Sequence, residues 1–243
     1  MQPPVHAEMK LRQAAIVAGV AYLLNPVSYA EIVLYPKVVI AGNIAQTVHN
    51  INVDGETFVL AILCYLINFI EDLVIAWALY VLLTPVNQPV SLLTAWFRVL
   101  YTALGLFALL NLVTVYRALH DPAYAATLAP SQIQAQVELL LGSFRWGWQF
   151  SLLIFGIHLA LLGYLIFRSG YIPRFLGAIT TFIGVGWIAV QLRPYLYPDL
   201  NLRWFFIVGF AELLLPLWLL IFGWRIPEPV APIPPARYPE SPA

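Results

Sequence analysis

Charged residues are scarce in this chain. Asp, Glu, Lys and Arg make up only 10% of its 243 residues, whereas a soluble protein carries about 25%. Hydrophobic residues, in contrast, make up 61% of the chain. A soluble fold of this length would not cover its surface with so few charges, so the composition excludes one. We therefore expect an integral membrane protein, with the lipid bilayer as its main partner.

The chain also lacks a surplus of either charge, cysteines for disulfides and the common catalytic motifs. Twelve basic and twelve acidic residues cancel, so we expect no basic face and no nucleic-acid partner. The single cysteine, Cys64, excludes an internal disulfide and a cysteine-based zinc cluster. The sequence contains no phosphate-binding glycine loop, no HExxH and no GxSxG. It therefore does not support a nucleotide-binding, zincin or serine-hydrolase function.

Six apolar runs are long enough to cross a bilayer, which takes about 20 residues as a helix. Each run is continuous, whereas the strands of a membrane β-barrel would be about ten residues long and alternate in hydropathy. We therefore predict an all-α polytopic membrane protein, a bundle of six transmembrane helices within residues 11–225. The predicted spans are residues 11–35, 58–83, 92–116, 144–167, 175–194 and 204–224.

The segments outside this domain are short. Residues 1–10 form the expected cytoplasmic N-terminal segment. Residues 226–243 contain seven prolines, and proline interrupts a helix because it lacks the N–H group. We expect these residues to form an extended, disordered tail.

Basic residues near the ends of the spans indicate the orientation. Over all loops, six basic residues lie on one side of the membrane and five on the other. Lys10 and Arg12 precede the first span, and Arg168 and Arg174 flank the short loop between the fourth and fifth spans. Because Lys and Arg accumulate on the cytoplasmic side, we expect a multi-pass protein of the cell (inner) membrane with both termini in the cytoplasm.

Two loops on the opposite side contain amphipathic segments. Between residues 36 and 57, apolar residues recur at a spacing close to four, which predicts a short helix at the membrane surface. In the third loop, residues 131–141 form either a second interfacial helix or an early extension of the fourth span.

Several polar residues fall near the middle of the predicted spans. Depth follows from a rise of about 1.5 Å per residue, counted from the cytoplasmic end of each span. Three acidic residues and a histidine lie about 14 to 20 Å deep, and two asparagines lie about 21 to 22 Å deep. Polar groups at this depth are costly, so they usually meet a partner or serve a function. The candidates for a ligand or proton site are Asp72, Glu71, His158, Glu212, Asn25 and Asn68.

Arg98 is the expected partner of Asp72. It enters the third span at a depth of about 9 Å, and its long side chain reaches further into the bilayer. A buried guanidinium favours a carboxylate, and Asp72 shares a helix face with Asn68. Glu71 points about 100° away from Asp72. We interpret the pair either as a structural ion pair that docks the second span on the third, or as part of a functional site.

Two prolines free backbone carbonyls inside the spans. Pro216 cannot donate to the carbonyl of Glu212, so a carboxylate and a free carbonyl lie at one level of the sixth span. Pro26 has the same effect on the carbonyl of Tyr22. We interpret Glu212 as a functional-site candidate that holds a proton near neutral pH unless a cation or Arg98 stabilises its charge.

His158 has both a structural and a functional interpretation. A single histidine in a span is more often a hydrogen-bonding strut than a ligand, although imidazole also relays protons and binds haem iron. His158, Glu212 and Asp72 would share a zinc or iron ion only if three helices brought them together. The sequence assigns no metal and no cofactor.

Several stretches of the sequence resemble a known family. The stretches are LYVLLTPVN (79–87), WFR (96–98), FGIH (155–158) and GYLIFRSGYIPRFLG (163–177). They resemble the bacterial family numbered 4386 among the domains of unknown function, over about residues 10–225. The resemblance implies a six-helix bacterial membrane protein whose activity is not established. Asp72, Arg98, His158 and Glu212 match the family pattern without an assigned role, and the proline-rich tail departs from it.

Three functions follow from these features. The first is a binding or transport protein whose carboxylates take a proton, a cation or a small amphipathic ligand. The second is a membrane-embedded enzyme that uses Glu212 or Asp72 as a base and His158 as an acid or metal ligand. The third is a non-catalytic sensor or scaffold. We favour the first, because several acids at one depth suit a proton or cation; six helices make a small pathway, which a homodimer would enlarge.

Overall fold

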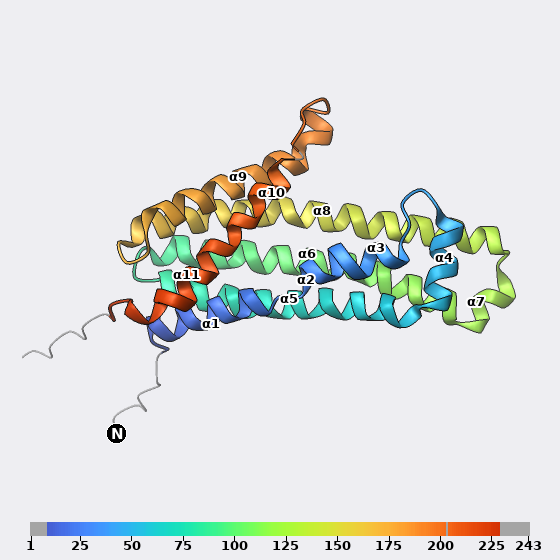
Figure 1. Cartoon of the computed structure of the whole chain (residues 1–243), viewed down its shortest axis with the longest axis horizontal. Coiled ribbons are helices and arrows are strands. Elements are labelled where there is room, and N and C mark those ends of the chain that lie inside the picture. Colours follow the sequence, from blue (N-terminus) through green and yellow to red (C-terminus); the bar gives the residue numbers. More distant parts are fainter. Residues whose placement is uncertain (1–8, 203, 229–243) are drawn as a thin grey trace, which may run out of the picture.

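The computed structural model describes residues 9–202 and 204–228, and every regular element in this part of the chain is a helix. The expected N-terminal segment 1–10 and tail 226–243 thus lie almost wholly outside the described residues. Five helical stretches are long and apolar enough to cross a membrane, and they form an elongated bundle (Figure 1). They are Leu11–Val38, Gly55–Leu83, Gln88–His120, Pro130–Ser169 and Arg174–Leu196. The prediction of an all-α, multi-pass membrane protein is confirmed.

Three long helices form the centre of the bundle. They are α5 (Gly55–Leu83), α6 (Gln88–His120) and α8 (Pro130–Ser169). Asp54 and Asn87 cap the starts of α5 and α6 by accepting backbone N–H groups. Gly170 ends α8 in the left-handed conformation, with φ 73°, which glycine adopts without a steric penalty.

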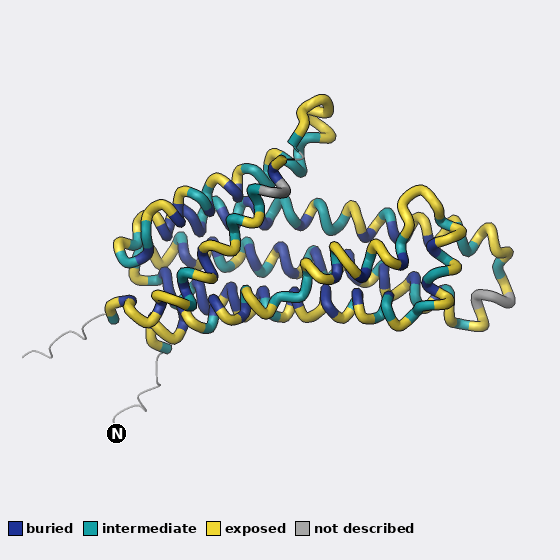
Figure 2. Tube along the Cα trace, in the orientation of Figure 1, coloured by how far each residue is buried: buried dark blue, intermediate teal, exposed yellow. Residues whose placement is uncertain are grey.

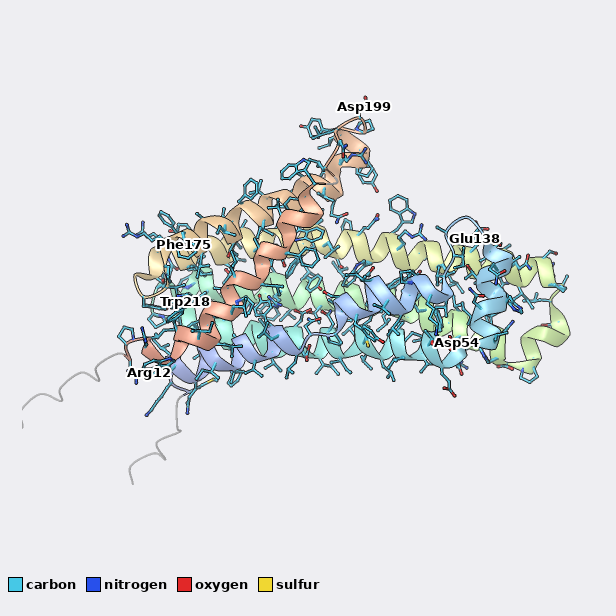
Figure 3. All side chains as sticks on the ribbon, viewed as in Figure 1. Arg12, Asp54, Glu138, Phe175, Asp199 and Trp218 are labelled. Carbon is cyan, nitrogen blue, oxygen red and sulfur yellow. The ribbon has the colours of Figure 1, made fainter. Side chains whose placement is uncertain are left out.

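The two ends of the bundle differ. Figure 3 shows Arg12 at one end, here called the terminal end, and Asp54 at the other, here called the distal end. Helix α9 (Arg174–Leu196) starts at the terminal end, and its 23 residues rise about 34 Å, enough to cross the hydrocarbon once. Helix α8 has 40 residues and continues about 25 Å further toward the distal end. Residues 131–141 belong to α8, so they extend the fourth span and do not form a separate helix.

The first span is broken near its middle. It consists of α1 (Leu11–Leu24), α2 (Val27–Tyr29), the π-helix η1 (Ala30–Leu34) and α3 (Tyr35–Val38). Asn25 is extended, as the residue before a proline favours. Its side-chain oxygen accepts the Val27 N–H at 2.9 Å. The helix predicted over residues 11–35 is therefore interrupted at Pro26, where a backbone donor is missing.

The predicted sixth span, residues 204–224, is divided into short pieces. They are α10 (Phe205–Gly209), the 3-10 helix η2 (Phe210–Leu213), α11 (Leu214–Phe222) and the 3-10 helix η3 (Gly223–Arg225). Before Pro216 the backbone tightens, and the Leu214 N–H bonds to the carbonyl of Ala211, three residues earlier. Residues 9–202 and 204–228 therefore do not contain six uninterrupted spanning helices. The segment nevertheless runs obliquely along the bundle toward the terminal end (Figure 1).

Residues far apart in the sequence meet at the terminal end. The Glu228 carboxylate accepts the backbone N–H of Leu11 at 3.0 Å and that of Arg12 at 3.1 Å. It thereby caps α1, whose first N–H groups have no partner within the helix. Arg12 Nε in turn donates to the carbonyl of Ile226 at 2.8 Å. The segment that follows α9 therefore returns to the end of the bundle at which α1 begins.

Two short helices complete the distal end. Helix α7 (Pro122–Thr127) joins α6 to α8, and α4 (Ile44–Val53) lies against α5, α6 and α8 and buries Thr47 and Ile51. A helix between residues 36 and 57 is present as α4, and its place at the membrane surface stays a prediction. Lys37 pairs with Asp54 at 2.8 Å, and this hydrogen bond lowers the pKa of Asp54 below its ordinary value.

The bundle is apolar on the outside as well as inside. Buried residues line the inner faces of the helices, while exposed residues cover the outer faces (Figure 2). Among the exposed side chains are Phe107 at 74%, Phe150 at 57% and Ile70 at 55%. An apolar surface of this extent suits contact with lipid.

Candidate functional site

A buried arginine lies at the centre of the polar residues. Arg98 on α6 is 1% exposed, and Asp72 on α5 is 2% exposed. Arg98 Nε donates to Asp72 Oδ1 at 3.0 Å, and Nη2 forms an ion pair with the same oxygen. An isolated charge would be strongly destabilising in this buried environment. The opposite charges of Arg98 and Asp72 compensate each other.

Two further groups contact the guanidinium. Arg98 Nη1 donates to the Tyr22 hydroxyl at 2.5 Å and lies 3.1 Å from His158 Nε2. The other ring nitrogen, His158 Nδ1, lies 2.9 Å from the carbonyl oxygen of Thr94. A carbonyl only accepts, so Nδ1 carries the hydrogen and Nε2 accepts from Arg98. His158 is therefore a neutral acceptor that holds the guanidinium in place.

Two asparagines extend this network to the break in the first span. Asn68 Nδ2 donates to Asp72 Oδ2 at 3.3 Å, and Asn25 Nδ2 donates to Asn68 Oδ1 at 2.6 Å. The network joins α6, α5, α8 and the broken first span. We call it the Arg98 cluster; its members are Arg98, Asp72, Tyr22, His158, Asn68 and Asn25.

Glu212 lies next to the Arg98 cluster. It is half-buried in η2, and its Oε1 accepts the Trp187 Nε1–H at 2.5 Å. Beside it is a cavity of about 10 Å³, which has room for about one water molecule. Tyr22 belongs to both the cavity and the cluster, so the cavity connects Glu212 with Arg98. The lining residues are Tyr22, Leu159, Thr180, Glu212 and Leu215.

Glu71 is the candidate residue that lies apart from the cluster. It precedes Asp72 on α5 and therefore points about 100° away around the helix. It is half-buried, and its Oε2 is buried without a hydrogen-bond partner. Adjacent acids in the sequence thus have separate environments in the fold.

Two tyrosines and one acid form polar contacts that the sequence does not predict. For Tyr22 the sequence points only to the carbonyl, yet its hydroxyl contacts Arg98. A second, partly buried polar pair forms where the Tyr65 hydroxyl donates to Glu31 Oε1 at 2.6 Å. Glu31 lies in the π-helix η1, and its charge inside the first apolar run was the available signal. Tyrosines give no such signal, because they occur throughout apolar spans.

The site does not fit a metal shared by His158, Glu212 and Asp72. Within residues 9–202 and 204–228, no three His, Cys, Asp or Glu side chains are placed to hold a metal ion. Both ring nitrogens of His158 already have partners, and Asp72 is paired with Arg98.

The family and the relative that match this chain are described without an activity. The model of a family described as a domain of unknown function, DUF4386, matches residues 17–223. An uncharacterized protein of Archaeoglobus fulgidus is 30% identical over 164 residues, which cover 67% of this chain and 83% of that protein. No solved structure matches the chain. The region matched by the family model contains the whole Arg98 cluster and Glu212.

Proposed function

Because the chain belongs to the DUF4386 family, a domain of unknown function, we propose its function from the site itself. We propose that it is a multi-pass membrane protein that binds and transports a proton or a small cation at Glu212. One observation carries the proposal: Glu212 and Tyr22 line one cavity, and Tyr22 binds the guanidinium of the buried ion pair. A cavity with room for about one water suits a proton or a small cation better than an amphipathic ligand.

Each group near Glu212 has a distinct role in this proposal. Arg98 donates to the Tyr22 hydroxyl, so Tyr22 keeps its own hydrogen for an acceptor in the cavity. Trp187 donates to one oxygen of Glu212, which leaves the second oxygen for a proton or a cation. A change of charge at Glu212 then acts on Arg98 through Tyr22 and through the low dielectric of the site.

We propose, further, that residues 204–224 form the sixth span. Helix α9 leads away from the terminal end, and Glu228 lies back at that end beside Leu11. If α9 crosses the bilayer, the chain crosses it once more between these points. An even number of crossings places both ends of the domain on one side, and α4 then lies at or beyond the opposite surface.

The basic residues near the terminal end support a cytoplasmic, inner-membrane orientation for it. In a Cys64→Ala background, Gln88→Cys at the terminal end is expected to be shielded from an impermeant thiol reagent in intact cells. Asn52→Cys at the distal end is expected to be labelled. Both positions are exposed, and permeabilised cells serve as the control in which both react. Labelling of Gln88→Cys alone in intact cells would invert the orientation.

Glu212→Gln tests the proposed function. Raising the pH from about 5 to 9 removes a proton held at Glu212 and leaves a charge close to hydrocarbon, so the melting temperature of the wild type should fall. In the variant the side chain at position 212 is neutral at every pH. Its melting temperature should therefore change less with pH than that of the wild type. At pH 9, Na⁺ or K⁺ should raise the melting temperature of the wild type but not of the variant if the site takes a cation.

The matched control is Glu138→Gln, which removes an exposed carboxylate at the distal end. It should keep the wild-type dependence on pH. Coinciding pH profiles for the wild type and Glu212→Gln would exclude Glu212 as the titrating group.

A further inference from the structure

A shallow groove lies on the outer face of α5 and α6, away from the Arg98 cluster. It has a volume of about 420 Å³. Its floor is apolar, and Leu60 and Leu63 are each 45% exposed there. Glu56 is exposed at its distal side. The lining residues are Glu56, Val59, Leu60, Leu63 and Tyr116.

Counted along α5, the groove lies near the expected distal edge of the bilayer. Counted from Leu83 at about 1.5 Å per residue, Leu63 lies about 30 Å along α5, and Glu56 about 40 Å. The hydrocarbon is about 30 Å thick, and the headgroup layers lie outside it. With the hydrocarbon taken to begin at Leu83, Leu63 lies at its distal edge and Glu56 lies at the level of the headgroups.

The apolar floor continues toward the membrane interior. Leu66, Ile67 and Ile70 follow the groove along α5 and are 37%, 45% and 55% exposed. An acyl chain that leaves the groove would therefore remain on apolar side chains. Tyr116 adds an aromatic ring with a polar tip, which is typical of the interface between hydrocarbon and headgroups.

Glu56, at the distal side of the groove, has no ion-pair partner among the described residues. The ion pairs among the described residues are Arg12–Glu228, Lys37–Asp54 and Arg98–Asp72, and none of them includes Glu56. The neighbouring acid, Asp54, already has Lys37 as its partner. The Glu56 carboxylate, which is exposed and in no ion pair among these residues, complements a cationic group at headgroup level.

We infer that this groove binds a lipid of the distal leaflet whose headgroup carries an amine. The acyl chain lies over Leu60 and Leu63, and the ammonium group meets the Glu56 carboxylate. The site is separate from Glu212, so it does not depend on proton or cation binding there. The inference does require that the bundle spans the membrane with its distal end at the level of the headgroups.

Native mass spectrometry of the full chain in detergent tests this inference. The probes are phosphatidylethanolamine and phosphatidylglycerol with identical acyl chains, added in equal amounts. The wild type is expected to retain the ethanolamine lipid preferentially. Glu56→Gln should weaken its retention by about threefold to fivefold, the effect of one exposed ion pair. Retention of the glycerol lipid should not fall.

Three variants test whether the groove itself holds the lipid. Glu138→Gln removes an exposed distal carboxylate outside the groove and should keep the wild-type preference, as should Glu212→Gln. Leu60→Ala should weaken retention of both lipids, because both use the apolar floor. Lipid retention is compared only between proteins with the same melting temperature as the wild type. If Glu56→Gln melts at a lower temperature, Glu56→Ala replaces it; Leu63→Ala replaces Leu60→Ala in the same way. Equal retention of the two lipids by the wild type, or an unchanged preference in the Glu56 variant, would overturn the inference.

Discussion

Replacing Arg98 by leucine is expected to lower the free energy of unfolding by about 3 to 5 kcal/mol, the usual effect of breaking a buried ion pair. The change leaves the Asp72 carboxylate, 2% exposed, without a counter-charge. It also removes the donor to Tyr22 and His158. Asp72→Leu should have an effect of similar size, because it leaves a buried guanidinium. Denaturant unfolding in detergent micelles measures both.

The double change Arg98→Leu/Asp72→Leu tests whether the two side chains stabilise the protein through their interaction. Removing both charges should cost less than the sum of the single changes, since no isolated charge is left behind. Arg117→Leu is the control: it removes an exposed arginine from the same helix and should change the free energy of unfolding by under about 0.5 kcal/mol. Strictly additive losses would show that Arg98 and Asp72 act independently.

A valine at Gly163 is expected to disrupt the packing of α8 against α9. A Cβ atom there would overlap the Thr181 side chain and would lie 2.5 Å from both the Gly177 carbonyl oxygen and the Thr181 nitrogen. Two of these contacts are with backbone, which cannot move aside without separating the helices. Overpacking of this kind should cost about 3 kcal/mol, the upper part of its usual range. The melting temperature in detergent should fall accordingly.

Gly142→Val supplies the matched control for this change. Gly142 lies in the same helix, and a Cβ atom built there meets no heavy atom within 4 Å. The intrinsic helix propensity changes in the same way at both positions. Similar melting temperatures for the two variants would show that close contact between α8 and α9 contributes little.

Much of the fold follows from local properties of the sequence. Apolar runs of spanning length predict α5, α6, α8 and α9, because a helix needs about 20 such residues to cross the hydrocarbon. Proline lacks the N–H group, so the effects at Pro26 and Pro216 were foreseeable. The prediction extended the first span through Pro26, however, because hydropathy does not register a missing hydrogen bond.

The contacts of Glu212 could not be predicted in this way. Its partner, Trp187, lies on α9, and its cavity neighbour, Tyr22, lies on the first span. These contacts depend on how three helices rotate about their axes and cross one another. Hydropathy gives the depth of a residue in the membrane but not the direction in which a side chain of a separate helix points.

The sequence by itself determined the solvent and the helical class, because hydrophobicity is a local quantity. The depth of each polar group in the bilayer stays a prediction from the rise per residue. Tertiary structure alone decided which polar groups meet. Glu71 and Asp72 are adjacent in the chain, yet Asp72 joins the Arg98 cluster and Glu71 does not. Leu11 and Glu228 are 217 positions apart and share a hydrogen bond. The physical reason is that a contact between helices depends on their relative rotation and crossing, which are set by side-chain packing over the whole bundle.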